Sequence, residues 1–271
     1  MASPYVHTNG FGGTAGATLA TLSPVYTSGV VWYVHSGTGT DAVSPRGKER
    51  LRPLASIAQA HTNASNNDVI VFLSGHSETI TGTTTLSKTG VHYLGEGSGT
   101  SRPTFIRNVD ANGYVFSGAG CLIENLLFDN DGALALTTGD RVVVSGASCS
   151  VVGCYFKVSS TALITSAALV VSAANTTISG GTQFVNAGST NTLGGLSVGN
   201  VADLTLDDVL FDGGSSGWGS GVVAAVLGTI TRLKAKNVDL LNGSDMTIAT
   251  SSFGTLHVRL KTGASQVVWA A

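Results

Sequence analysis

The sequence CLIENLLF at residues 121–128 returns four times in altered form: CSVVGCYF at 149–156, TISGGTQF at 177–184, LTLDDVLF at 204–211 and LKAKNVDL at 233–240. Each copy closes on a bulky apolar residue, and the spacings between successive closing residues are 28, 28, 27 and 29. Such even returns are hard to obtain by chance in a chain with only 9 phenylalanines. A period of roughly 20–50 residues is typical of solenoids, in which each coil packs on the next.

Two short strands and a corner account for the pattern inside each copy. Successive side chains of a β-strand point to opposite faces. The first, third, sixth and eighth residues of each copy therefore face the core, if a turn after the third residue shifts this alternation by one position. In the third copy this puts Thr177 and Ser179 inside. The fifth position holds residues that tolerate a left-handed backbone: Asn125, Gly153, Gly181, Asp208 and Asn237. We therefore predict an all-β chain that forms a parallel β-helix with rungs of about 28 residues.

The composition agrees with a turn-rich β protein. Glycine contributes 36 of the 271 residues, nearly twice its usual share of ~7%. The hydrophobic share of 42% excludes an intrinsically disordered chain. The formal net charge of −2 provides no basic footprint, so nucleic acid is not an expected partner. No apolar run approaches the ~18 residues that a membrane-spanning helix needs, so we expect no membrane association.

The chain divides into a leader and one repetitive domain. Residues 1–30 are rich in Gly, Thr, Ala and Ser, and we predict an extended N-terminal arm there, with a first strand layer as the alternative. Residues 31–271 are predicted to form a single β-helix domain. The N-terminus lacks the basic and apolar regions of a secretory signal, so synthesis in a cytoplasm is expected.

A helix is predicted to cover the first rung. Leu54, Ile57 and Ala58 follow Pro53 at helical spacing, which indicates a short amphipathic helix near residues 53–61. The end of a solenoid is an open sheet edge with an exposed core, and a helix placed before the first rung would cover it.

The cysteines and histidines indicate neither a disulfide framework nor a metal site. The chain has 3 cysteines with no CxxC spacing: Cys121, Cys149 and Cys154. The repeat places Cys121 directly under Cys149, where we expect two buried thiols, with a disulfide as the alternative. The 6 histidines are scattered, so we predict no metal and no cofactor.

Two further motifs carry a family resemblance. The sequences DVIVFLSGHSETI at 68–80 and GEGSGTSRPTF at 95–105 resemble the opening of pectin-lyase-like right-handed β-helices, and more closely a group of β-helical proteins of tailed bacteriophages and prophages. The resemblance covers residues 45–130 and implies a right-handed β-helix and a virion protein, often associated with the head. Within the first motif, His76 and Glu78 point the same way along a strand. We expect them to fix the corner by hydrogen bonding rather than to transfer protons.

The carboxylates do not form a convincing catalytic group. Glycosidases need carboxylates that converge at roughly 5–10 Å. Glu124 and Asp207 share a column but lie three rungs apart, and Asp208 occupies the corner position. Asp129 is expected to pair with Lys157 in the next rung. We therefore predict a protein that is not an enzyme, with a glycosidase or lyase site as the minor alternative.

Two groups of residues are candidates for partner binding. Four cations lie within seven positions and could dock on an acidic partner surface, although a solvated loop is the alternative: Arg46, Lys48, Arg50 and Arg52. Apolar residues that face outward, or close the chain, are candidates for a subunit interface, with cover by a loop as the alternative: Leu127, Tyr155, Leu210 and Trp269.

Together with the resemblance, these features predict a non-enzymatic structural protein of a phage virion. The leading role is a capsid decoration (cement) protein that stabilises the head. We expect a homotrimer bound to the major capsid protein on the outer capsid surface, after synthesis in the host cytoplasm. The alternative is a tail fibre or tailspike that binds or cleaves host-surface polysaccharide.

Overall fold

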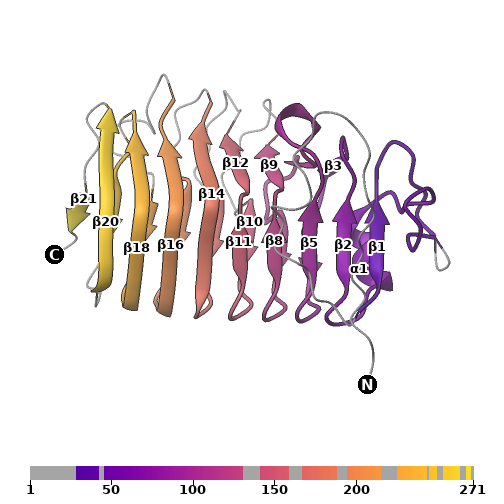
Figure 1. Ribbon diagram of the computed structural model, residues 1–271, viewed down its shortest axis with the longest axis horizontal. Helices are drawn as coiled ribbons and strands as arrows, with labels where there is room; N and C mark the ends of the chain where they lie inside the picture. Colours follow the sequence, from indigo (N-terminus) through magenta and orange to yellow (C-terminus); the bar gives the residue numbers. More distant parts are fainter. Residues whose placement is uncertain are drawn as a thin grey trace, which may run out of the picture.

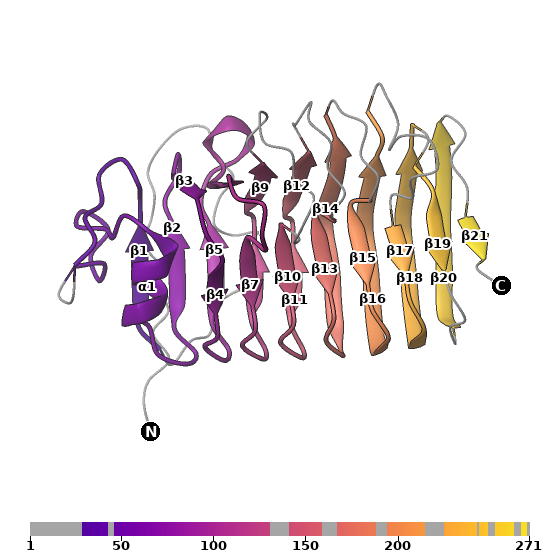
Figure 2. The same ribbon diagram turned by 180° about the vertical axis from the view of Figure 1, so that it is seen from behind.

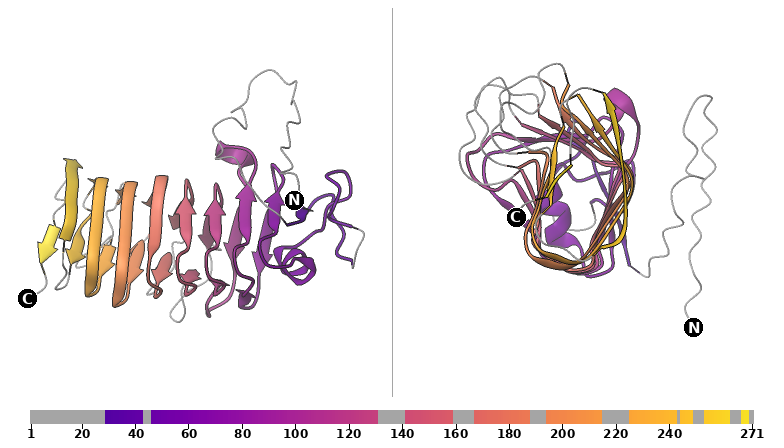
Figure 3. Two further views of the ribbon diagram at one scale, coloured as in Figure 1. Left: turned by 60° about the horizontal axis from the view of Figure 1, so that its bottom comes forward. Right: turned by 90° about the vertical axis from the view of Figure 1, so that its left-hand side faces the viewer.

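The chain winds into a right-handed parallel β-helix, seen from the side in the computed structural model of Figure 1. It rises along one sheet, crosses over and descends along a second sheet while advancing along the axis (Figures 1 and 2). Seen along that axis, successive rungs lie over one another (Figure 3, right). The predicted fold class is confirmed. The structure describes residues 29–42, 46–130, 141–158, 167–187, 194–214, 225–242, 244–248, 253–262 and 267–269.

Every pairing between neighbouring strands in the described residues is parallel. In the early rungs, the first sheet has separate lower and upper strands. The lower ones are β1 (Val31–Val34), β2 (Val69–Phe72), β5 (His92–Gly95), β8 (Leu122–Glu124) and β11 (Ser150–Val152). The upper ones are β3 (Ser77–Ile80), β6 (Thr104–Arg107), β9 (Leu127–Asn130) and β12 (Tyr155–Val158).

Later rungs join the two halves into one long bent strand. These strands are β14 (Thr176–Asn186), β16 (Val201–Asp212), β18 (Ile230–Leu241) and β20 (Phe253–Thr262). The second sheet, visible in Figure 2, contains β4 (Thr84–Leu86), β7 (Tyr114–Phe116), β10 (Val142–Val144), β13 (Leu169–Val171), β15 (Leu196–Val198), β17 (Ala225–Leu227), β19 (Met246–Ile248) and β21 (Val267–Trp269).

The predicted corner column is confirmed by the backbone. Its five members all have a positive φ: 55° at Asn125, 60° at Gly153, 75° at Gly181, 59° at Asp208 and 52° at Asn237. Glycine adopts this conformation freely, and Asn and Asp tolerate it better than other residues because their side chains hydrogen-bond locally. The corner bends the first sheet at the same point in each rung.

The predicted inward residues of the third copy are wrong by one position. Thr176 and Ile178 are 1% and 0% exposed, whereas Thr177 and Ser179 are half-buried and face outward. The cause is an extra corner residue: Gly180 and Gly181 both have a positive φ, and the register to β16 shifts between Ser179 and Thr182. A bulge of this kind moves every preceding side chain to the opposite face.

A column of stacked phenylalanines fills the core, as the closing residues predict. Phe128, Phe156, Phe184 and Phe211 are buried, and successive ring centroids lie 5.3, 4.9 and 4.8 Å apart with interplanar angles of 15°, 10° and 9°. Leu240 continues the column opposite Phe211. The prediction of buried thiols is also confirmed, because the three cysteines are free and buried.

The helix α1 (Ile57–Asn63) covers the N-terminal end of the solenoid, but it begins later than predicted. The Ser56 hydroxyl accepts from the Gln59 N–H at 3.2 Å and caps the first turn. Before it, Leu54 forms a parallel bridge to Val34, so this residue is extended rather than helical. The predicted arm over residues 1–30 lies outside the described residues except for Gly29 and Val30.

Candidate interaction surface

The predicted basic cluster lies in the connection between β1 and α1, at the N-terminal end of the solenoid (Figure 2). Backbone hydrogen bonds pin this connection, because the Tyr33 N–H donates to the Gly47 carbonyl at 2.6 Å and the Gly47 N–H donates to the Arg52 carbonyl at 2.9 Å. Gly47 has a φ of 87°, and a Cβ there would lie 2.8 Å from the Leu54 side chain. The loop is therefore held by its packing on the first rung.

Two of the four predicted docking cations already have partners. Arg50 forms a bidentate ion pair with Glu96, with Nη1–Oε1 and Nη2–Oε2 distances of 2.5 and 2.6 Å. This hydrogen bonding raises the pKa of Arg50 above its ordinary value. The Lys48 ammonium lies 5.4 Å from the centroid of the Trp32 ring. Arg52 is exposed and Arg46 is half-buried.

The loop also presents an apolar residue that the sequence reasoning missed. Leu51 stands between Arg50 and Arg52, and 94% of it is exposed. An apolar residue flanked by two arginines was the available signal, but only the structure shows that the loop turns this side chain away from the protein.

The predicted interface residues of the first sheet do share one outward row. Leu127 pairs with Tyr155, Tyr155 with Gln183, and Gln183 with Leu210, and all four are half-buried. Trp269, the fourth candidate, lies elsewhere. It belongs to β21 in the second sheet, where its backbone pairs with Ile248, because the chain crosses between the sheets after β20.

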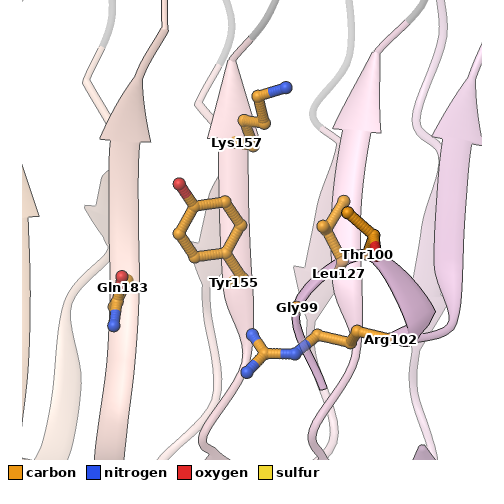
Figure 4. Close-up of a pocket in the computed structure, with 7 residues that line it drawn as sticks. All are labelled: Gly99, Thr100, Arg102, Leu127, Tyr155, Lys157 and Gln183. Atoms are coloured by element: carbon orange, nitrogen blue, oxygen red, sulfur yellow. The ribbon is translucent and has the colours of Figure 1, made fainter. Parts of the chain in front are cut away.

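A shallow hollow of about 390 Å³ lies over this row, walled on one side by the 3₁₀ turn Gly99–Ser101. In Figure 4, the Tyr155 ring lies on the floor between Leu127 and Gln183, with the Arg102 guanidinium beside it. The Arg102 Cζ is 6.0 Å from the ring centroid, and among the described residues its buried Nε has no hydrogen-bond partner. Gly99, Thr100 and Lys157 complete the lining.

The hollow combines an aromatic face, cationic groups and an amide. Lys157 Nζ lies 3.8 Å from Asp129 Oδ2, as the sequence predicts for this pair. Burial raises the pKa of Tyr155, so its hydroxyl remains protonated and able to donate. Such a lining suits polar or anionic groups better than a purely apolar ligand.

The remaining carboxylates make structural contacts. Glu124 Oε2 lies 2.9 Å from His92 Nε2. Asp207 accepts from the Asn237 amide at 3.3 Å, and Asp208 holds its corner position. Within the described part of the chain, no group of three or more His, Cys, Asp or Glu side chains is arranged to hold a metal ion.

His76 and Glu78 make structural hydrogen bonds, as expected, and these extend from the corner to the N-terminal cap. The Ser36 N–H donates to His76 Nδ1 at 3.0 Å, and the Ile57 N–H donates to Glu78 Oε2 at 2.9 Å. His76 Nε2 lies 3.4 Å from Glu78 Oε2. The pair thus joins the corner after β2 to the loop after β1 and to the start of α1.

Comparison with family models, curated proteins and solved structures finds no significant match. The resemblance to phage β-helices therefore stays a prediction. Among the described residues, no helix has the length and apolar character to cross a bilayer.

Proposed function

We propose that the protein is a non-catalytic structural protein of a bacteriophage virion that decorates the outer surface of the capsid. The observation that carries the proposal is the exposed Leu51 in the basic loop (residues 46–52), which backbone hydrogen bonds hold on the first rung. Leu51 is 94% exposed and is followed by the exposed Arg52, and this combination suits an apolar pocket with an acidic rim on a partner protein. The loop occupies one end of a rigid solenoid, which suits attachment by that end.

Self-association would use a different surface. The row of Leu127, Tyr155 and Leu210 lies on the side of the first sheet, away from the basic loop. Outward apolar rows of this kind are typical of subunit interfaces. We propose a homotrimer that contacts the major capsid protein through its loops. Additional buried interface between capsid subunits raises the free energy needed to separate them.

Binding to particles tests this proposal. Mass spectrometry of purified particles of the phage that encodes the chain should detect the protein. Purified protein should also sediment with particles from which it has been stripped. Leu51→Asp should abolish this sedimentation, whereas Leu260→Asp, which adds the same charge at a leucine 55% exposed near the other end, should not. Absence of the protein from the particles, or equal binding by both variants, would overturn the proposal.

The hollow over Tyr155 favours a second candidate, a tail fibre that binds host-surface polysaccharide. An aromatic ring with a neighbouring arginine and amide can bind the face and the polar groups of a sugar. A glycan array with the intact protein and with Tyr155→Ala distinguishes the two candidates. Specific binding that the variant loses would favour the fibre. Release of reducing sugar that Asp207→Asn or Asp208→Asn abolishes would show an enzyme instead.

A further inference from the structure

Two cysteine side chains are stacked in neighbouring rungs, at the starts of β8 and β11. Ser150 pairs with Leu122, and its N–H donates to the Cys121 carbonyl at 2.9 Å, so Cys149 lies directly beside Cys121. Both side chains point into the core, with 1% and 0% exposure. Parallel neighbours are about 4.8 Å apart, which falls within the Cα separation of about 4.4–6.8 Å that disulfides accept.

The two thiols lie close to each other and against turns of small residues. The two side chains are close enough to influence each other. The Cys121 thiol also donates to the Lys88 carbonyl at 3.2 Å, and the Cys149 thiol to the Gly118 carbonyl at 3.3 Å. The turns that precede the two cysteines consist of small residues, several of them exposed: Gly118, Ala119, Gly120, Gly146, Ala147 and Ser148. The sulfur atoms lie against these turns, since Cys121 Sγ is 4.0 Å from the Ala119 carbonyl and Cys149 Sγ is 3.9 Å from the Ala147 carbonyl.

We propose that Cys121 and Cys149 form an oxidation site that closes into a disulfide between neighbouring rungs. A small peroxide or a disulfide compound is the oxidant that accepts the two electrons. With hydrogen peroxide, the thiolate of one cysteine attacks an oxygen atom, the O–O bond breaks, and a sulfenic acid forms, while the departing hydroxide takes up the proton that this thiol had lost and leaves as water. The second thiol then attacks this sulfur, forms the S–S bond and expels a second water. Two thiols are oxidised and one peroxide is reduced.

Protonation and position distinguish this pair from the third cysteine. The interaction with Cys121 lowers the pKa of Cys149 below its ordinary value, which favours the reactive thiolate at this sulfur. Cys154 instead lies in the column of Leu126 and Thr182, and its thiol donates to the Ile123 carbonyl at 3.5 Å. Burial raises the pKa of Cys154 to about 12. Cys154 is therefore a natural control within the same protein.

The test compares the intact reduced protein before and after treatment with hydrogen peroxide or diamide. We expect the number of free thiols to fall from three to one per chain, with a mass lower by two hydrogen atoms after peroxide removal. Peptide mapping without reductant should link the peptide of Cys121 to that of Cys149. The oxidised protein should also unfold at a higher temperature than the reduced protein, because the bond closes a loop of more than one rung.

Variants provide matched controls. Cys149→Ala and Cys121→Ala should each prevent the cross-link, whereas Cys154→Ala should leave it unchanged. The peptide map of the wild-type protein shows whether the Cys121–Cys149 bond forms, even if a variant fails to fold. Oxidation that produces sulfinic acid, cross-links between chains or a bond to Cys154 would overturn the proposal. The outcome is independent of the proposed function, since the site lies in the core and touches neither the basic loop nor the hollow.

Discussion

Replacing Phe184 with alanine is expected to lower the free energy of unfolding by about 4 kcal/mol. The ring is 0% exposed and stacks on two others, with centroids 4.9 Å from Phe156 and 4.8 Å from Phe211. It also lies against Gly195, where a Cβ would come within 2.8 Å of the Phe184 Cβ. Removal of a buried phenylalanine ring costs roughly 3–5 kcal/mol, and loss of two stacked pairs argues against the lower end of that range.

Urea unfolding followed by circular dichroism measures this loss. Phe184→Leu is the matched control, because leucine retains most of the apolar volume and should cost only about 1.5 kcal/mol. Hydrogen exchange should become faster in β12 and β16, since each rung of a solenoid is stabilised by its neighbours. An alanine variant no less stable than the leucine variant would contradict this expectation, because the apolar bulk at position 184 would then contribute nothing to stability.

Three other perturbations test the corner, a buried histidine and the N-terminal cap. Asn237→Ala should lower the free energy of unfolding by about 1 kcal/mol in a urea titration, because alanine adopts the φ of 52° found at this position less readily than asparagine does. Asn237→Gly should be nearly neutral in the same titration. Burial lowers the pKa of His61 to about 4 from 6.5, so the unfolded chain takes up the proton first as the pH falls. The free energy of unfolding should be highest above about pH 6.5 and should fall by about 2 kcal/mol towards pH 4. Urea titrations at each pH measure this fall, which should be smaller for His61→Gln. Asp68→Ala should cost about 3 kcal/mol or more, because Asp68 accepts from the Val30 N–H, the Trp32 Nε1–H and the Ser65 N–H at 2.6, 2.9 and 2.8 Å. A thermal midpoint close to that of the wild type would show that water replaces these contacts.

The repeat was predictable because a solenoid is nearly one-dimensional. Each rung contacts only the rungs before and after it, so the period in the sequence is also the period in space. Phe128 and Phe156 could be assigned to one column from their spacing alone. Asn125 and Asn237 could be assigned to a corner because few residues tolerate a left-handed backbone. The ion pair of Asp129 with Lys157 followed from the same register.

The third copy shows where local counting fails. Two glycines at 180 and 181 permit either one or two left-handed residues in the corner, and the sequence does not distinguish these possibilities. The choice depends on whether Ile178 or Ser179 packs between the neighbouring rungs. Burial of the isoleucine favours the longer corner, and this preference exists only once the rungs are stacked.

Amino-acid pattern alone was enough for the parallel β-helix, its rung length, its corner residues and its buried thiols, because these depend on contacts between adjacent repeats. The candidate binding surfaces depended on tertiary structure. Leu51 is exposed because backbone hydrogen bonds and the Arg50–Glu96 pair, whose members are 46 positions apart, hold its loop on the first rung. The hollow exists because the turn Gly99–Ser101 and Arg102 lie beside Tyr155, more than 50 residues later in the chain. Neither arrangement follows the period of the repeat, so no spacing in the sequence could indicate it.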